Sequence, residues 1–104
     1  MTLHIDTKDQ KVIKVALKEN GKAVKSLSAK NKYGSQVLLP LIIKLLKRKG
    51  VNLRHLEGVL KEVEVETGPG SFTGIRVGVS VANALGYSLG ILVNGKKIET
   101  DLVY

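Results

Sequence analysis

The chain opens with alternating apolar and polar side chains, a pattern that predicts strands with one buried face. The alternation runs through residues 2–7 and 11–18, and a period of two residues is typical of a half-buried strand. Its apolar positions are Leu3, Ile5, Ile13, Val15 and Leu17. Residues 19–22 contain an Asn-Gly pair, which favours a tight hairpin turn, and residues 22–28 supply a third strand. We therefore expect an antiparallel meander.

Predicted helices and strands alternate through the rest of the chain. Residues 35–49 are rich in apolar positions with a helical period, and Gly50 is placed to end that helix. The other expected elements are a turn at 53–56, a strand at 59–66, a helix at 73–88, a strand at 90–93 and, after an Asn-Gly turn at 94–95, an edge strand at 98–103.

This order of elements, βββαβαβ with an extra edge strand, favours one mixed sheet. Right-handed crossovers place the later, parallel strands beside the opening meander, and the strand order 3-2-1-4-5 satisfies them. When both crossovers step in the same direction, both helices cover one face of the sheet. The sequence therefore predicts a single α/β lobe over residues 1–104, of the ribonuclease-H-like type that forms the core of actin-like ATPases.

The fourth predicted strand indicates that the other face of the sheet is open and charged. Its valines lie on one side and its glutamates on the other, whereas a parallel strand buried on both faces would be continuously apolar. The glutamates are Glu62, Glu64 and Glu66. They could form a carboxylate cluster, but we expect them to pair across the sheet with cations. The available cations are His4, Lys14 and Lys18.

Both predicted helices carry more apolar surface than one sheet can cover. The first has an apolar arc of roughly 240° when residues are placed about 100° apart, whereas a helix on a sheet needs a stripe of about 100° or somewhat more. The second has small residues at every fourth position, which allows another backbone to approach closely. We therefore expect both helices to contact another subunit. The expected contact residues are Leu38, Ile42, Leu45, Gly74, Val77, Gly78, Val81, Ala82 and Leu85.

Composition narrows the function classes. The chain has no cysteine, which excludes disulfides and thiol catalysis, and it has no apolar run of the roughly 18 residues needed to span a membrane. We expect a cytoplasmic protein. The net charge is +8, and eight lysines between Lys8 and Lys32 face only Asp9 and Glu19. Such a field attracts polyanions, including RNA, although a solubilising surface is the better explanation for lysines on strands and turns.

A glycine-rich junction at residues 68–78 joins the fourth strand to the second helix. It reads Gly-Pro-Gly-Ser-Phe-Thr-Gly-Ile-Arg-Val-Gly, and Ser71 or Thr73 is placed to cap the helix. Neither a Walker loop nor a dinucleotide fingerprint matches it, so tight turns and close packing explain its glycines best. A minor alternative is phosphate binding by Asp6, Gly70, Ser71, Thr73 and Arg76. No catalytic group, cofactor or metal site is expected.

This junction resembles the GPGSFTG signature of the TsaB family, which supports synthesis of threonylcarbamoyl-adenosine on tRNA. The opening Ile-Asp-Thr at residues 5–7 and the Ser-x-x-Leu-Leu-Pro segment at 35–40 also resemble that family. The resemblance implies an actin-like fold and a non-catalytic binding subunit. Family members continue into a second lobe, which is expected to be absent here.

The resemblance also implies partners. It suggests a complex with the transferase subunit TsaD through the two helices, a homodimer when the chain is alone, and association with a TsaE-like ATPase and tRNA. Two other classes stay open. One is an enzyme lobe that binds nucleotide or metal through Asp6 and the 68–74 loop, and the other is a small basic RNA-binding module.

Overall fold

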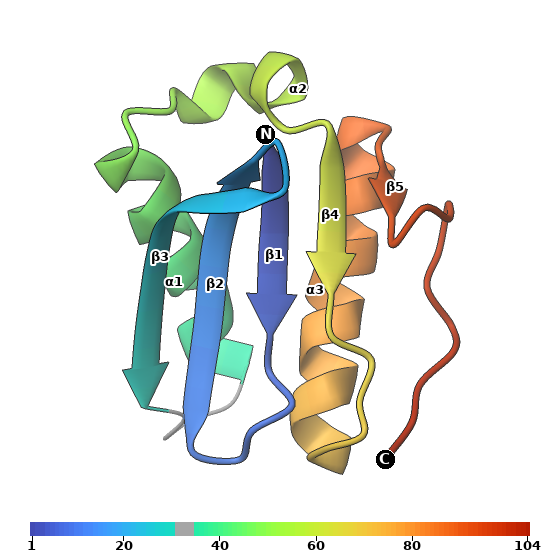
Figure 1. Ribbon diagram of the computed structural model, residues 1–104. Coiled ribbons are helices and arrows are strands. Elements are labelled where there is room, and N and C mark those ends of the chain that lie inside the picture. Colours follow the sequence, from blue (N-terminus) through green and yellow to red (C-terminus); the bar gives the residue numbers. More distant parts are fainter. Residues whose placement is uncertain (31–34) are drawn as a thin grey trace.

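The computed structural model describes residues 1–30 and 35–104, and its elements follow the predicted order (Figure 1). They are β1 (Thr2–Asp6), β2 (Val12–Glu19), β3 (Lys22–Lys30), α1 (Ser35–Arg48), a 3-10 turn η1 (Leu53–His55), α2 (Leu56–Val59), β4 (Glu62–Val65), α3 (Phe72–Leu89) and β5 (Leu92–Val93).

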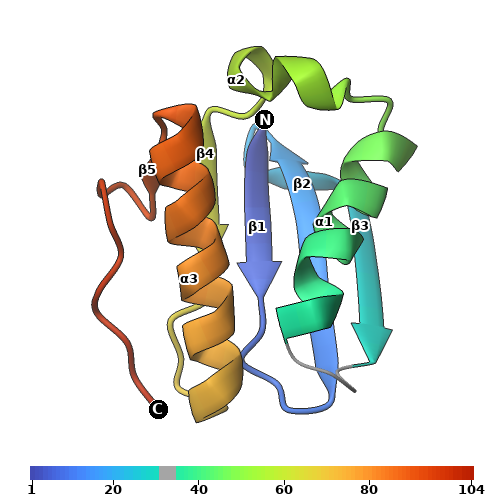
Figure 2. The same ribbon diagram turned by 180° about the vertical axis from the view of Figure 1, so that it is seen from behind.

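The sheet has the predicted order β3-β2-β1-β4-β5. β1 pairs antiparallel with β2 and parallel with β4, and β4 pairs parallel with β5. The reverse view shows α1 and α3 side by side on the same face of the sheet (Figure 2). The predicted ribonuclease-H-like lobe, with two helices on one face, is therefore confirmed.

The C-terminal segment departs from the prediction. The Asn-Gly turn forms, with positive φ angles at Asn94 and Gly95 and an isolated bridge from Val93 to Lys96. The predicted edge strand at 98–103 is wrong, because the chain follows instead an irregular path beside α3 and β4. It is held by side chains and by one backbone hydrogen bond of 2.8 Å from Val103 N–H to the Thr67 carbonyl. We call residues 98–104 the strap.

A left-handed glycine ends each long helix, as predicted for Gly50, whereas Gly90 was expected to begin a strand. At the end of α1, Gly50 has a φ of 82°, and Val51 N–H donates to the Leu46 carbonyl at 2.9 Å. At the end of α3, Gly90 has a φ of 68° and its N–H reaches the Gly86 carbonyl. Glycine tolerates this left-handed conformation without strain, which stops each helix cleanly. No helix in residues 1–30 or 35–104 is long and apolar enough to cross a membrane.

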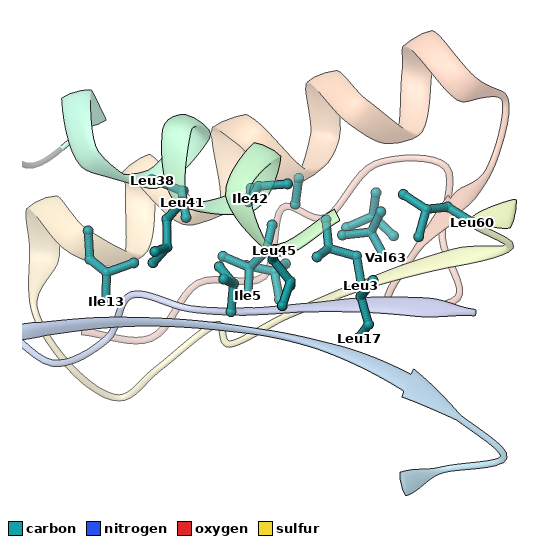
Figure 3. Close-up of a cluster of buried hydrophobic side chains, with 14 of the residues drawn as sticks. Leu3, Ile5, Ile13, Leu17, Leu38, Leu41, Ile42, Leu45, Leu60 and Val63 are labelled. Atoms are coloured by element: carbon teal, nitrogen blue, oxygen red, sulfur yellow. The ribbon is translucent and has the colours of Figure 1, made fainter. Parts of the chain in front are cut away.

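The core lies between the helices and one face of the sheet, as Figure 3 shows. The odd-numbered residues of β1, β2 and β4 point into it, and α1 supplies a row of leucine and isoleucine side chains. Its members with less than 2% exposure include Leu3, Ile5, Ile13, Leu17, Leu38, Leu45, Leu60, Val63 and Ile75. Each such side chain stabilises the fold by about 1.5–3 kcal/mol relative to its exposed state.

Candidate functional site

The glycine-rich junction packs against the end of β1. Ser71 caps α3, since its Oγ accepts the Gly74 N–H at 3.2 Å, and its own N–H donates to the Lys8 carbonyl at 2.8 Å. A Cβ added at Gly70 would lie 2.6 Å from that same carbonyl oxygen. The junction is therefore closed by this chain's own backbone, and the structural explanation of its glycines is confirmed.

Thr7 determines how close α3 comes to the sheet. Its side chain is buried, and its hydroxyl donates to the Gly74 carbonyl at 2.5 Å. A Cβ at Gly74 would collide with the Thr7 carbonyl, and one at Gly78 would collide with the Thr7 hydroxyl. The small residues of α3 therefore pack against this chain's own segments, Gly74 and Gly78 against Thr7 just beyond β1 and Gly86 against Val93 of β5. Sequence reasoning missed Thr7, which only the close match between helix and strand reveals.

This packing corrects the predicted contact surface. Six of the nine expected contact residues are buried within the chain, so they present little surface to a partner. They are Leu38, Ile42, Leu45, Gly74, Gly78 and Ala82. The row Val77, Val81 and Leu85 is only partly buried against the core and keeps an accessible side.

The row Val77–Val81–Leu85 lies on the flank of α3 that faces β2. Val77 shares a small hollow with Ile13 of β2, whereas Asn83, on the other flank, bonds to the strap. Because α1 covers β2 and β3 and also contacts α3, this row lies on the side of α3 nearer α1, and Figure 2 shows the two helices side by side.

Apolar side chains are exposed on the outward faces of both helices. On α1, Leu39 is 46% and Ile43 is 36% exposed. On α3, a shallow hollow of about 340 Å³ is lined by Phe72, Thr73, Arg76, Val77, Ser80 and Val81. Neither Leu39 nor Ile43 is among the expected contact residues. The helical period shows how wide the apolar arc of a helix is, but it does not show which part of that arc the sheet covers. We call the combined set Leu39, Ile43, Phe72, Val77 and Val81 the outer apolar surface.

Aromatic contacts border this surface at the start of α3. The Phe72 and Tyr104 rings have centroids 4.5 Å apart at an interplanar angle of 47°. The Arg76 guanidinium lies 5.2 Å from the centre of the Phe72 ring. Arg76 is therefore directed along the outside of the helix.

The residues of the minor phosphate-binding alternative do not converge. The hollow beside Ser71 and Thr73 measures about 80 Å³, and neither Asp6 nor Arg76 lines it. Sites for small molecules usually occupy roughly 300–1,000 Å³. Asp6 instead closes a turn, with its Oδ1 accepting the Lys8 N–H at 3.2 Å. The geometry gives no support to a nucleotide site at this loop.

The open face of the sheet is charged, as predicted, and two of its three glutamates are paired. Glu62 and the expected cation Lys14 form no ion pair among the described residues, and Lys8 takes the place of Lys14. Glu64 Oε1 lies 3.0 Å from both His4 Nδ1 and Lys18 Nζ, and Glu66 Oε1 lies 2.7 Å from Lys8 Nζ. Hydrogen bonds from His4 and then Lys18 lower the pKa of Glu64, and that from Lys8 lowers the pKa of Glu66. No group of three or more potential metal ligands occurs among the residues described.

A buried carboxylate fastens the strap, and sequence reasoning missed it. The Glu99 side chain is only 4% exposed, and its oxygens accept hydrogen bonds from Asn94, Lys96 and the Asp101 N–H. Its backbone exchanges two hydrogen bonds, of 2.9 and 3.0 Å, with the Asn83 side chain. The Asn94 side chain also accepts a hydrogen bond from the Val65 N–H and donates one to the Val65 carbonyl. The strap is thereby joined to α3 and β4.

This network predicts acid sensitivity. Burial raises the pKa of Glu99, but the hydrogen bonds from Asp101, Asn94 and Lys96 outweigh it, so the pKa lies below its ordinary value. The stabilisation is therefore present above the ordinary glutamate pKa and is lost as pH falls through the lowered one. We expect Glu99→Gln to reduce the free energy of unfolding by about 1–3 kcal/mol at neutral pH.

Urea denaturation at neutral pH and at about pH 3 checks this prediction. The difference between Glu99→Gln and the parent chain should shrink as pH falls, because the parent Glu99 takes up its proton as pH passes through its lowered pKa. Glu19→Gln, on the exposed end of β2, serves as the control and should change little. Equal losses for the two variants would contradict the assigned network.

The sheet order, the two helices on one face and the glycine junction closed onto β1 define a lobe of the ribonuclease-H-like, actin-like class. Residues 11–95 match the family model described as TsaD, tRNA N6-adenosine threonylcarbamoyltransferase. The chain belongs to that family. No curated protein matches it significantly.

Two similar solved structures connect the chain to YeaZ, which is TsaB under its other name. YeaZ from Pseudomonas aeruginosa is 29% identical with a TM-score of 0.71, and the match covers 88% of this chain and 41% of that one. An uncharacterised protein with similarity to peptidase YEAZ from Pseudomonas aeruginosa gives 29% identity, a TM-score of 0.71 and coverages of 88% and 40%. The predicted TsaB resemblance is confirmed, and the chain spans about two fifths of these structures.

Proposed function

We propose that this chain acts as a non-catalytic, TsaB-like subunit in the synthesis of threonylcarbamoyl-adenosine on tRNA. In this proposal it binds a TsaD-like transferase through the outer apolar surface, and two copies pair through the same surface when the transferase is absent. Its contribution is shape, since it presents two helices on a rigid sheet to the partner's helices.

One observation carries the proposal, namely that the outward faces of both helices keep apolar side chains accessible. Leu39, Ile43 and Phe72 are 46%, 36% and 55% exposed, and Val77 and Val81 are partly buried against the core. A contiguous apolar patch on a small domain commonly marks a contact with another protein. The family membership and the YeaZ-like fold support the transferase as that partner.

The geometry of the described polar residues supports a binding role over catalysis. The open-face glutamates Glu64 and Glu66 are occupied by cations, and Ser71 is occupied as a helix cap. General acid–base or nucleophilic chemistry needs an activated group within reach of a partner base and a substrate site. The hollow beside Ser71 offers only about 80 Å³.

A charge placed in the outer apolar surface should disrupt the complex. We expect Val81→Glu to weaken binding to the transferase subunit by at least about tenfold, because burying an unpaired carboxylate in an apolar contact is costly. Calorimetric titration of the purified transferase into the variant measures the affinity, and light scattering measures the self-association of the variant alone.

Tyr87→Glu provides a matched control on the same helix. Tyr87 is 88% exposed and lies near the end of α3, outside the outer apolar surface. Its substitution should leave transferase binding within about twofold of the parent. If Val81→Glu bound as tightly as Tyr87→Glu, with both variants folded, the outer apolar surface would not be the contact.

A further inference from the structure

One end of the molecule gathers cations from segments that are distant in sequence. The Met1 amino group donates to the Val59 carbonyl at 2.9 Å, and Lys61 N–H donates to the Met1 carbonyl at 2.9 Å. Because Thr2 pairs with Lys18, the β2–β3 turn lies at this end as well. Figure 1 shows the turn, the end of α1 and the η1–α2 segment around the N-terminus. We call this region the basic end.

The basic end has a large excess of positive charge. Residues 47–61 contain five cations and one carboxylate, Glu57. The cations are Lys47, Arg48, Lys49, Arg54 and Lys61, and all five are exposed. The nearby hairpin adds exposed Lys22 and Lys25 against Glu19. Most of these cations lie outside the lysine-rich segment at 8–32, which is the basic region that the sequence analysis identifies.

The cations of the basic end form no ion pairs within the described part of the chain. The ion pairs found there engage His4, Lys8, Lys18 and Lys96, on the open face and at the strap. Two lysines of the early lysine-rich segment, Lys8 and Lys18, are therefore partly neutralised by Glu66 and Glu64, whereas the cations of the basic end have no such partners among the described residues.

We infer that the basic end binds the phosphate backbone of RNA. Its cations are spread over the end of α1, the η1–α2 segment and the β2–β3 turn, which suits an extended polyanion. An acidic peptide is usually fixed through its backbone along an edge strand, whereas the five cations at 47–61 lie on α1, on η1 and in loops, outside the strands. The inference goes beyond the partner contact and rests on the proposed function only for the choice of tRNA as the RNA.

The basic end lies beside the outer apolar surface without coinciding with it. Lys47 and Arg48 share a shallow hollow with Ile43 along the outside of α1, whereas Lys49, Arg54 and Lys61 do not line it. An RNA held at this end would therefore run next to a partner bound to the two helices. The three outer cations can be changed without touching the proposed partner contact.

Binding of an unmodified tRNA transcript to the purified chain, followed by fluorescence anisotropy over a salt series, tests the inference. We expect the logarithm of the association constant to fall steeply with the logarithm of salt concentration, by roughly 0.7–0.9 per phosphate contact. The triple variant Lys49→Gln, Arg54→Gln, Lys61→Gln should reduce that slope by about 2 and weaken binding at least about tenfold at about 100 mM salt.

The triple variant Lys11→Gln, Lys14→Gln, Lys30→Gln is the matched control, because it removes the same charge from the opposite end of β2 and β3. It should weaken binding less than about threefold. Equal weakening by both triples, no measurable tRNA binding by the parent chain, or preferential binding of poly-glutamate would each overturn the inference.

The two proposals can fail separately. Val81→Glu should lose the transferase and keep tRNA, and the Lys49–Arg54–Lys61 variant should lose tRNA and keep the transferase. Failure of the parent chain to bind the transferase, with tRNA binding intact and confined to the basic end, would overturn the proposed function alone.

Discussion

Gly78→Leu is expected to lower the free energy of unfolding by about 2–4 kcal/mol, even though leucine gains about 1 kcal/mol over glycine in a helix. The reason is the contact of α3 with Thr7, where even a Cβ at position 78 would collide with the buried hydroxyl. The Thr7 hydroxyl is held by its hydrogen bond to the Gly74 carbonyl, so it cannot turn away without loss. Urea denaturation followed by circular dichroism measures the change.

Gly58→Ala is the control for this substitution. A Cβ at Gly58, in the short helix α2, would meet nothing within 4 Å. The change should therefore leave stability unaltered or raise it by up to about 1 kcal/mol, since alanine is the better helix former. If Gly78→Leu were as stable as Gly58→Ala, the packing of Gly78 against Thr7 would be contradicted. The small residues of α3 would then lie on an exposed surface that is accessible to a partner.

The architecture of this lobe follows from local patterns in the sequence. The period-two alternation in residues 2–7 and 11–18 sets which faces of β1 and β2 are buried, and the two helical segments force right-handed crossovers. The order 3-2-1-4-5 satisfies those constraints when both crossovers step in the same direction, and it is the order observed. The charged face was predictable for the same reason, since Glu64 and Lys18 alternate with buried valine and leucine.

Which apolar side chains of the helices stay exposed could not be predicted in the same way. Small residues at every fourth position of α3 allow close approach of either a partner's backbone or the chain's own. The residue that Gly74 and Gly78 pack against, Thr7, is 67 residues away from Gly74 in the sequence, so no local pattern reveals the contact. On α1, one broad apolar arc holds both the side chains of the core and the exposed ones. Leu45 faces the sheet while Leu39 and Ile43 face outward, and only the position of the sheet separates them.

The path of the strap could not be predicted from the sequence for a different reason. Glu99 is a single carboxylate in an irregular segment, so no period indicates that it is buried. Its burial depends on donors from Asn94 and Lys96, which lie close in sequence, and on Asn83, which lies 16 residues away on α3. The Asn-Gly turn at 94–95 instead favoured an edge strand at 98–103. The hydrogen bonds of Asn83 with the Glu99 backbone replace the ladder that such a strand would have formed.

Leu45→Ala is expected to lower the free energy of unfolding by about 2–5 kcal/mol, which is the usual loss for truncating a fully buried leucine. Leu45 has no exposed surface and packs with Leu3, Ile5 and Leu17 in the core (Figure 3). The loss combines the transfer free energy of the removed methyl groups with the cavity that remains. Urea denaturation of the isolated chain measures it in the absence of any partner.

Leu39→Ala is the matched comparison, because it makes the same truncation on the same helix at a side chain that is 46% exposed. It should lower the free energy of unfolding by less than about 1 kcal/mol and weaken transferase binding instead. The pair therefore separates core from contact on α1. If Leu45→Ala left the isolated chain stable while abolishing the complex, Leu45 would be an anchor for the partner, and the assignment of the outer apolar surface to Leu39 and Ile43 would be wrong.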